Sequence, residues 1–290
     1  MRKEFTYLWR LFVGICVAVC ISGWAGDCGI GESGNSEGQN ADPAELSGVL
    51  RLAGSTSMEK LSNAWAECFM ERYPHVRVSA EFVGSSAGIE AVLSGGADIG
   101  NSSRSLKESE RAEGAVENPV AIDGIVVCVD SSNGINGLTC GQLIDIYMGN
   151  IVNWRELGGP DLPVVVMGRE AGSGTREVFE GSLGIVDQCD YANELDSAGA
   201  VMARVASTPG AIGYVSLDIV DASVKVLSLE GVKPSEESIR NGSYLLGSPL
   251  MMVTRGEVEG QNEIVQAWFA YVYSGEGQAV AEQLGYIKAR

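Results

Sequence analysis

The chain has 290 residues, and its 45% of hydrophobic residues can supply the core of one large domain or of two lobes. Its 38 acidic residues against 20 basic ones give a net charge of −18, which argues against nucleic acid as a partner, because nucleic acid is bound by clustered basic residues. A single histidine and cysteines without a CxxC pair argue against a zinc site, so we expect no metal and no cofactor.

Residues 1–25 have the layout of a secretion signal. Basic Arg2 and Lys3 precede an apolar run from Leu11 to Ala25, which is too short to span a bilayer comfortably. Small residues near its end suit cleavage after Ala25. We therefore expect an exported protein.

The mode of anchoring stays open on sequence alone. Cys20 or Cys28 can carry a lipid, and an uncleaved anchor helix is a third option beside simple cleavage. Residues 26–47 are rich in Gly, Ser, Asn and Glu, which is typical of a flexible linker. We expect a protein of the cell surface or periplasm that an N-terminal lipid or helix tethers to the membrane.

From residue 48 onward, strand patterns and helix patterns alternate, which is typical of an α/β fold with mostly parallel pairing. The predicted strands are Val49–Ala53, Val76–Phe82, Val120–Val129, Val164–Met167, Ile212–Val215 and Leu250–Val253. The predicted helices are Ser57–Arg72, Ala87–Leu93, Cys140–Tyr147, Arg176–Leu183, Ala198–Ala206, Gln261–Tyr273 and Gly277–Leu284.

Three of these strands lead through a turn rich in Ser and Gly into a helix. The turns are Gly54–Ser57, where Thr56 and Glu59 fit a capping box, Gly84–Gly88 and Gly168–Arg176. Such a turn directs free backbone N–H groups and the positive end of a helix dipole at one point. One turn alone is equally well explained as a helix cap, but three together favour a shared oxyanion site between α/β lobes.

Six blocks carry a resemblance to a known family. In chain order they are GSTSMEKLSNAWAECF, FVGSSAGIEAVLSGGADIGNSSR, VAIDGIVVCV, LTCGQLIDIYMGNIVNW, GREAGSGTREVF and TPGAIGYV. They resemble the periplasmic-type phosphate-binding protein of the high-affinity phosphate ABC transporter, over residues 48 to 254. The resemblance implies a two-lobed periplasmic-binding-protein fold in which each lobe is a mixed sheet flanked by helices, and in which two crossover strands join the lobes.

The resemblance also implies domain limits and partners. With crossings near Ala121–Gly124 and Leu250–Val253, lobe I comprises residues 48–122 and 252–290, and lobe II comprises residues 123–251. The implied function is capture of inorganic phosphate between the lobes and its delivery to a membrane ABC permease. We expect a monomer without enzymatic activity.

Site residues are implied where this sequence matches the family pattern. Thr56 and Ser57 match the first turn, and Ser85 matches the hydroxyl donor of the second. The third turn supplies an arginine, two hydroxyls and backbone amides through Arg169, Ser173, Gly174 and Thr175. For each hydroxyl the alternative is a helix cap.

One departure from the pattern concerns selectivity. The family aspartate that accepts a hydrogen bond from protonated phosphate is replaced by Ser103, which is followed by Arg104. An acceptor-only group distinguishes phosphate, which carries a proton near neutral pH, from sulfate, which does not. Asp123 is the best replacement, with Ser103 as a neutral partner nearby; the alternative is a hinge aspartate that binds backbone amides.

Two motifs resemble those of enzymes but lack a residue that the chemistry needs. Gly84–Gly88 fits the G-x-S-x-G motif of α/β hydrolases, but the only histidine, His75, lies upstream of Ser85. The turn after Gly168 lacks the Gly-Lys-Ser/Thr ending of a P-loop. A receptor for sulfate, molybdate or another oxyanion, and a surface phosphatase or adhesion-like protein on the same scaffold, are the alternatives.

The four cysteines beyond the N-terminal region carry less information. Cys68 and Cys128 lie in apolar sequence and are expected in the core. Whether Cys140 pairs with Cys189 is left open.

Overall fold

The computed structural model describes residues 46–288. The predicted signal segment, its cleavage site, Cys20, Cys28 and most of the predicted linker lie outside the described residues. Among residues 46–288, no helix combines the length and the apolar character that crossing a membrane requires.

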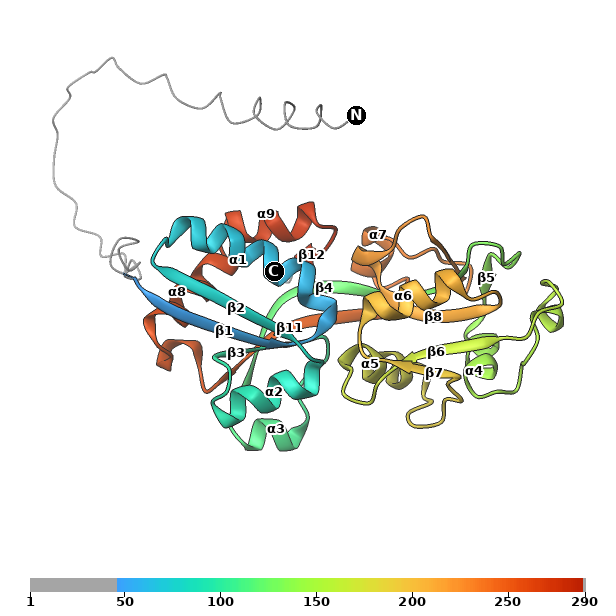
Figure 1. The fold of residues 1–290 in the computed structure, drawn as a ribbon, viewed down its shortest axis with the longest axis horizontal. Helices are drawn as coiled ribbons and strands as arrows, with labels where there is room; N and C mark the ends of the chain where they lie inside the picture. The colour runs from blue at the N-terminus through green and yellow to red at the C-terminus, as the bar shows by residue number, and fades with distance from the viewer. Residues whose placement is uncertain (1–45, 289–290) are drawn as a thin grey trace, which may run out of the picture. The chain divides into compact units, whose positions relative to one another are not determined.

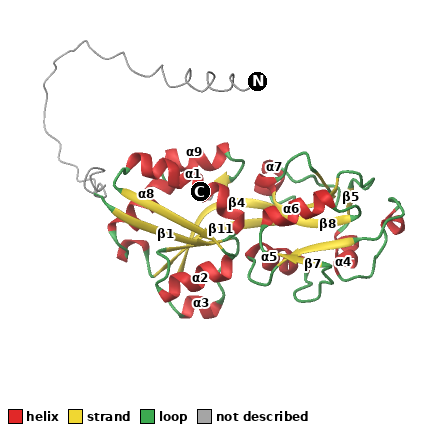
Figure 2. Cartoon of the chain, in the orientation of Figure 1, coloured by secondary structure: helices red, strands yellow, loops and turns green. Residues whose placement is uncertain are grey.

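The described chain alternates strands and helices (Figures 1 and 2). The strands are β1 (Gly48–Gly54), β2 (Val76–Phe82), β3 (Ile99–Ser102), β4 (Ala115–Asp130), β5 (Gly137–Leu138), β6 (Val165–Arg169), β7 (Asn193–Leu195), β8 (Ala211–Ser216), β9 (Val224–Val226), β10 (Ser228–Leu229), β11 (Gly247–Arg255) and β12 (Ile287–Lys288). The helices are α1 (Glu59–Arg72), α2 (Ser85–Ser94), α3 (Glu108–Ala112), α4 (Cys140–Tyr147), α5 (Gly174–Leu183), α6 (Ala198–Ser207), α7 (Glu236–Arg240), α8 (Glu263–Val272) and α9 (Gly275–Gln283). Short 3₁₀ turns are η1 (Thr56–Met58), η2 (Trp154–Leu157), η3 (Leu217–Ile219) and η4 (Val258–Gly260).

One mixed sheet runs through the described chain, in the order β2-β1-β3-β11-β4-β8-β6-β7, with β9 and β12 also paired to β4. The pairs of β1 with β2 and β3, and of β6 with β7 and β8, are parallel. The pairs that involve β4 or β11 are antiparallel. The α/β prediction is therefore confirmed. The expectation of mostly parallel pairing is wrong, because both long strands, β4 and β11, pair antiparallel with all their neighbours.

Two large hydrophobic cores lie on either side of these long strands. The first contains Trp65, Phe69 and Trp268, from segments near both ends of the described chain. The second contains Tyr147 and Phe179 from the middle of the chain. This arrangement is the predicted two-lobed fold, and we call the lobes I and II in that order.

Strands β4 and β11 cross from one lobe to the other side by side (Figure 1). On β4, Ala121 packs in the first core and Ile125 in the second. On the returning chain, Leu246 packs in the second core and Leu250 in the first. The limits of the lobes at 122/123 and 251/252 remain predictions.

The helices next to the crossing begin at side-chain caps. Ser173 accepts a hydrogen bond from the backbone of Arg176 and starts α5, and Ser197 starts α6 in the same way. The predicted capping box of Thr56 with Glu59 is wrong. Ser55 caps η1 instead, because its hydroxyl accepts from the backbone N–H of Ser57 at 3.3 Å.

Candidate functional site

A cluster of hydroxyl groups forms where the two lobes meet. It consists of Ser55, Ser57, Ser85 and Ser103 of lobe I and Thr175 of lobe II, and we call it the hydroxyl cluster. Ser57 Oγ lies 2.8 Å and Ser103 Oγ 3.3 Å from Thr175 Oγ1. Ser103 Oγ also lies 3.0 Å from Ser55 Oγ and 3.3 Å from Ser85 Oγ. All five residues are buried.

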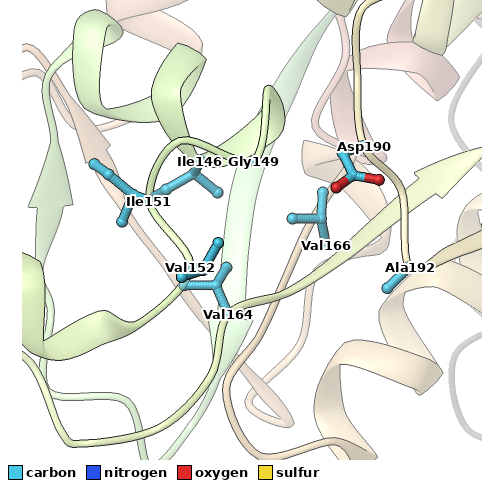
Figure 3. A pocket seen from close by; sticks show the side chains of 8 residues that line it. All are labelled: Ile146, Gly149, Ile151, Val152, Val164, Val166, Asp190 and Ala192. Atoms are coloured by element: carbon cyan, nitrogen blue, oxygen red, sulfur yellow. The ribbon is translucent and has the colours of Figure 1, made fainter.

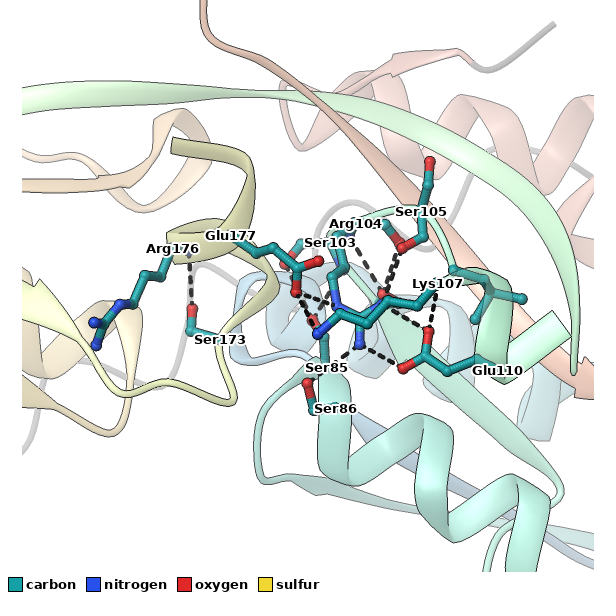
Figure 4. A network of polar contacts seen from close by, with 12 residues as sticks. Ser85, Ser86, Ser103, Arg104, Ser105, Lys107, Glu110, Ser173, Arg176 and Glu177 are labelled. Atoms are coloured by element: carbon teal, nitrogen blue, oxygen red, sulfur yellow. Dashed lines mark hydrogen bonds and ion pairs between the residues drawn. The ribbon is translucent and has the colours of Figure 1, made fainter. Parts of the chain in front are cut away.

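The strand-to-helix turns bring these hydroxyls together. Ser57 lies in η1 after β1, Ser85 opens α2 after β2, and Ser103 directly follows β3. Thr175 lies in the first turn of α5, after β6, and Figure 4 shows this helix facing the lobe that carries Ser85 and Ser103. Four of the predicted ligand residues are therefore in contact with one another, and they come from both lobes.

Gly174 lies directly against two hydroxyls of lobe I. A Cβ atom on this glycine would lie 2.5 Å from Ser85 Oγ and 2.9 Å from Ser103 Oγ. These separations are shorter than any ordinary carbon–oxygen contact, so a side chain at this position would force Ser85, Ser103 or the lobes themselves to shift. Neighbouring Ser173 is buried and uses its hydroxyl as the cap of α5.

Arg169 stands at the start of the same turn and is only 1% exposed. Its Nε donates to the carbonyl of Leu195 at 3.2 Å, and its Nη2 donates to the carbonyl of Asp196 at 3.0 Å. Burial lowers the pKa of this guanidinium, although an arginine stays charged at any physiological pH. Among the described residues, no carboxylate forms an ion pair with Arg169. The charges of nearby Glu170 and Asp196 offset part of this burial without pairing with the guanidinium. A buried cation without an ion-pair partner is costly, which favours an anionic ligand at this place.

Aromatic and charged groups behind Arg169 hold its backbone. The Arg169 N–H donates to the hydroxyl of Tyr214, which lies 3.2 Å from the hydroxyl of Tyr191. Tyr191 also donates to Glu180, and Glu180 accepts from Arg176 Nε at 2.7 Å. Burial raises the pKa of both phenols, so they remain protonated hydrogen-bond donors. This network lies within lobe II and fixes the start of the turn.

Thr56 contacts lobe II differently from the hydroxyl cluster. Its Oγ1 accepts a hydrogen bond of 3.4 Å from the backbone N–H of Ala198, at the start of α6. The carbonyl of Asp196, two residues before Ala198, accepts the hydrogen bond from the Arg169 guanidinium. Thr56 and Arg169 therefore contact the same segment of lobe II.

The structure does not join Asp123 to the hydroxyl cluster by a hydrogen bond. Its Oδ1 accepts from the Gly124 N–H at 2.7 Å, and its Oδ2 accepts from the hydroxyl of Ser216. It is nevertheless close to the site, because its pairing partner Ser248 donates to the Ser103 carbonyl at 3.0 Å. These contacts are those of a hinge aspartate, and the role in phosphate selectivity stays a prediction.

Asp123 shares its surroundings with a second carboxyl group. Burial and the nearby charge of Asp218 raise the pKa of Asp123 to about 7, although hydrogen bonds from Ser216 and the backbone lower it. Burial also raises the pKa of Asp218. The two carboxyl groups are therefore both shielded from water at the point where β4 enters lobe II.

Sequence reasoning missed several residues of this region. Ser55 lies in the hydroxyl cluster, Ala198 contacts Thr56, and Arg104 forms ion pairs described below. Ser55 carried a signal, since it stands in the same Gly-Ser-Thr-Ser run as the predicted ligands. Ala198 carried none, because a backbone N–H leaves no mark in the sequence.

The arrangement excludes a hydrolase triad built from Ser85. Ser85 follows the end of β2, while exposed His75 precedes its start, so the two residues are roughly 20 Å apart along an extended strand. The four cysteines of the described chain, Cys68, Cys128, Cys140 and Cys189, are all free, so the pair left open at Cys140 and Cys189 is not formed.

A separate small pocket lies within lobe II, away from the hydroxyl cluster (Figure 3). It encloses about 130 Å³ and is lined mainly by aliphatic residues, together with Asp190: Ile146, Gly149, Ile151, Val152, Val164, Val166 and Ala192. None of the predicted ligand residues lines it.

Residues 35–276 match the PBP superfamily domain. The chain belongs to the PBP superfamily. Among curated members of this superfamily, it is 33% identical over 266 residues to the phosphate-binding protein PstS of Bacillus subtilis, and the match covers 89% of this chain and 87% of that protein. It is 30% identical over 271 residues to the protein of the same name from Pseudomonas aeruginosa strain PAO1, with 83% of each chain covered.

Solved structures of PBP superfamily members agree. A putative phosphate ABC transporter substrate-binding protein with bound phosphate, from Clostridium perfringens, superposes with a TM-score of 0.80 at 35% identity, covering 84% of this chain and all of that one. An ABC-type phosphate transport receptor from Vibrio cholerae gives a TM-score of 0.70 at 32% identity, covering 82% and 99%. The resemblance predicted from six sequence blocks is confirmed.

Proposed function

We propose that the protein is an extracytoplasmic solute-binding protein that captures inorganic phosphate between its lobes and delivers it to an ABC permease. The observation that carries this proposal is the hydroxyl cluster, in which donors from both lobes converge beside a turn that starts with a buried arginine lacking an ion-pair partner. Relatives at 30% identity and above that are named phosphate-binding proteins support it.

The proposed ligand set follows the sequence expectation. Ser57, Ser85, Ser103 and Thr175 would turn their hydroxyl hydrogens from one another to the oxygens of a tetrahedral anion. Arg169 would supply positive charge, and Thr56, Ser173 and the backbone of Gly174 would complete the ring of donors. Hydroxyls and amides suit a desolvated oxyanion whatever the net charge of the distant surface, because salt screens exposed charges beyond roughly 10 Å.

The same donor set suits other tetrahedral oxyanions. A receptor for sulfate or molybdate is therefore the second candidate of the same class. Isothermal titration of refolded, ligand-stripped protein with phosphate, sulfate and molybdate decides among the three. Tight binding of phosphate alone supports the proposal, and tighter binding of either other anion overturns it.

Selectivity against sulfate is proposed to depend on Asp123. A carboxylate accepts a hydrogen bond from the protonated oxygen of phosphate, but it faces only lone pairs on sulfate, which costs several kcal/mol when buried. Asp123→Asn should weaken phosphate binding and strengthen sulfate binding. Both effects bring the two dissociation constants closer together. Competition binding at pH 8, where Asp123 with its pKa of about 7 is mostly ionised and phosphate still carries a proton, measures the ratio of the two constants. An unchanged ratio would mean that Asp123 is only a hinge residue.

We also propose export and membrane tethering through the N-terminal segment, and a monomeric state. A phosphatase that uses Ser85 as its nucleophile has no support from the described residues, since Ser85 has no histidine beside it. Mass spectrometry of protein purified from the membrane fraction shows whether Cys20 or Cys28 carries a lipid, and this distinguishes the modes of anchoring.

A further inference from the structure

Arg104 directly follows Ser103 of the hydroxyl cluster and is 2% exposed. Three groups of its own lobe hold the guanidinium. Its Nη2 lies 2.7 Å from a carboxylate oxygen of Glu110, and its Nη1 lies 2.9 Å from the other. Nη2 also donates to Ser86 Oγ at 3.2 Å, and Nη1 to the Ser105 carbonyl at 2.9 Å. The position of Arg104 is thus fixed within lobe I, whatever lobe II does.

The remaining nitrogen of Arg104, Nε, makes no hydrogen bond in the described residues of lobe I or lobe II, but it lies within ion-pair distance of lobe II (Figure 4). Arg104 Nε lies 3.0 Å from Glu177 Oε2, and Lys107 Nζ lies 3.2 Å from the same oxygen. Glu177 lies in α5 and is 38% exposed, whereas Lys107 is 53% exposed. A single carboxylate of lobe II therefore pairs with two cations of lobe I.

The strength of the two pairs differs. Burial alone would lower the pKa of Arg104, but its hydrogen bond with Glu110 and the charges of Glu177, Glu110 and Glu117 raise it overall. Water and salt screen the exposed Lys107 pair, and such pairs contribute little. The Arg104 pair is shielded on the arginine side and is screened less. We expect Arg104 to carry most of the attraction to Glu177.

These ion pairs are coupled to the candidate site through the chain. Arg104 is one residue from Ser103, and Glu177 is two residues from Thr175. Ser103 Oγ and Thr175 Oγ1 lie 3.3 Å apart in the closed arrangement. An anion that holds these two hydroxyls together therefore also holds Glu177 against Arg104, and opening the lobes would break both sets of contacts at once.

We propose that Glu177 is a closure residue, which clamps Arg104 and Lys107 across the lobes and thereby sets how long a bound oxyanion is retained. The proposal rests on the proposed function, because it concerns release from the same site. Glu177 is not proposed to touch the ligand. It acts only on the closed arrangement, so it should govern the release rate and leave the association rate nearly unchanged.

The test is Glu177→Gln in the full-length protein, with phosphate release followed by stopped-flow dilution. We expect release to become about 5- to 20-fold faster and association to change by less than about 2-fold. Glu236→Gln is the matched control. It removes the same charge from lobe II, in an ion pair with Arg240 that stays within α7, and its release rate should equal that of wild type.

A second variant keeps the test independent of any folding defect. Lys107→Gln, at an exposed side chain, should speed release by about 2-fold, and it should add nothing in the Glu177→Gln background because both act through one carboxylate. Additive effects of the two variants, or a release rate in Glu177→Gln equal to wild type, would overturn the proposal.

Failure of the proposed function would look different. If wild-type protein takes up no phosphate, the distance between one label on α1 and one on α7, attached to non-natural side chains, still reports closure. Longer distances in Glu177→Gln than in wild type would support the clamp without phosphate. Identical distance distributions in both proteins would contradict the proposed role of Glu177 in closure.

Discussion

At the scale of single residues, the unusual feature is a buried arginine whose hydrogen bonds go to carbonyl groups. Arg169 donates to the carbonyls of Leu195 and Asp196, which orient the guanidinium but do not neutralise it. Arg104, by contrast, is paired with two carboxylates. Arg104 is therefore already neutralised within the protein, whereas the charge of Arg169 remains available for an anionic ligand.

The first prediction concerns Arg169→Ala. Phosphate binding should weaken by about 2–5 kcal/mol, the range for removing one side of a buried charge-assisted contact. Arg169→Lys should restore only part of this, because an ammonium lacks the planar fork. Titration calorimetry measures both.

Arg155→Ala is the control for this series. Arg155 is an exposed arginine of the same lobe, paired with Asp161 on the surface. It should bind phosphate as wild type does. If Arg169→Ala folds normally and keeps wild-type affinity, the turn serves only to start α5.

The second prediction concerns the pH dependence of stability. Asp123 has a folded-state pKa raised to about 7 by burial and by Asp218, against an ordinary value of 3.8. The native state therefore holds a proton between these two values that the unfolded chain has released. By linkage, the contribution of Asp123 to the free energy of unfolding is largest below pH 4 and falls as pH rises to about 7, by on the order of 4 kcal/mol.

Urea denaturation of phosphate-free protein between pH 4.5 and 8 measures this fall. The free energy of unfolding of Asp123→Asn should depend less on pH, so that its difference from the wild-type value shifts in favour of the variant as the pH rises. Asp161→Asn, at an exposed carboxylate, should run parallel to wild type. Parallel curves for Asp123→Asn and wild type would show that Asp123 stays ionised in the fold.

Several of these residues could be anticipated from sequence, and others could not. Ser57, Ser85, Ser103 and Thr175 stand in strand-to-helix turns, where both the residue types and their positions indicate a donor. Arg104 and Glu177 stand next to these residues, but their pairing depends on how two lobes meet, which no local pattern encodes. The contacts of Asp123 depend on Ser216 and Asp218, roughly 90 residues further along the chain.

At the scale of elements, the site depends on how closely α5 approaches the turns of lobe I. This approach needs a helix whose first residue has no side chain, and Gly174 provides it. Ser85 and Ser103 belong to lobe I and α5 belongs to lobe II. The added Cβ would therefore meet them only when the lobes are closed.

The third prediction follows from this asymmetry. Gly174→Ala should weaken phosphate binding by at least about 10-fold, because the added methyl group would meet Ser85 and Ser103 on closure. The free energy of unfolding without phosphate should change by less than about 1 kcal/mol, since alanine is a good helix former. Calorimetry and urea denaturation measure the two quantities.

Gly181→Ala provides the matched control in the same helix. A Cβ on Gly181 would meet nothing within 4 Å, so phosphate binding should be unchanged and the helix should be slightly more stable. Equal binding by Gly174→Ala and Gly181→Ala would mean that the ligand-bound lobes do not approach this closely.

The longer elements could be predicted from their hydrophobic periods, and β2 and α4 were predicted with the observed limits. Strand β4 is longer than predicted, because its first residues include charged and polar side chains that pair with β11. The short elements β3, α3, β7 and α7 were not predicted. Three to five residues contain too little of a period to recognise, and tertiary pairing decides their conformation.

At the scale of the whole molecule, the contacts between the lobes fall into two kinds. The hydroxyl cluster and the Glu177 pairs lie at the site and involve groups that water can satisfy when the lobes part. The second kind is the pair of β4 and β11 at the hinge. Each of these strands runs from one lobe into the other, and backbone hydrogen bonds join the two strands along the crossing. Such a division suits a molecule that bends at two strands and opens at its polar contacts.

The last prediction is that phosphate closes the lobes. A ligand shifts this equilibrium only through contacts that differ between the open and closed forms, and the proposed donors come from both lobes. Small-angle X-ray scattering of full-length protein should show a smaller radius of gyration at saturating phosphate than without ligand. Gly174→Ala, whose added methyl group opposes closure, should keep the larger value even at phosphate concentrations that saturate its weaker site. A wild-type profile that phosphate leaves unchanged would rule out a hinge of useful amplitude, and the hydroxyl cluster would then be a preformed site on a rigid scaffold.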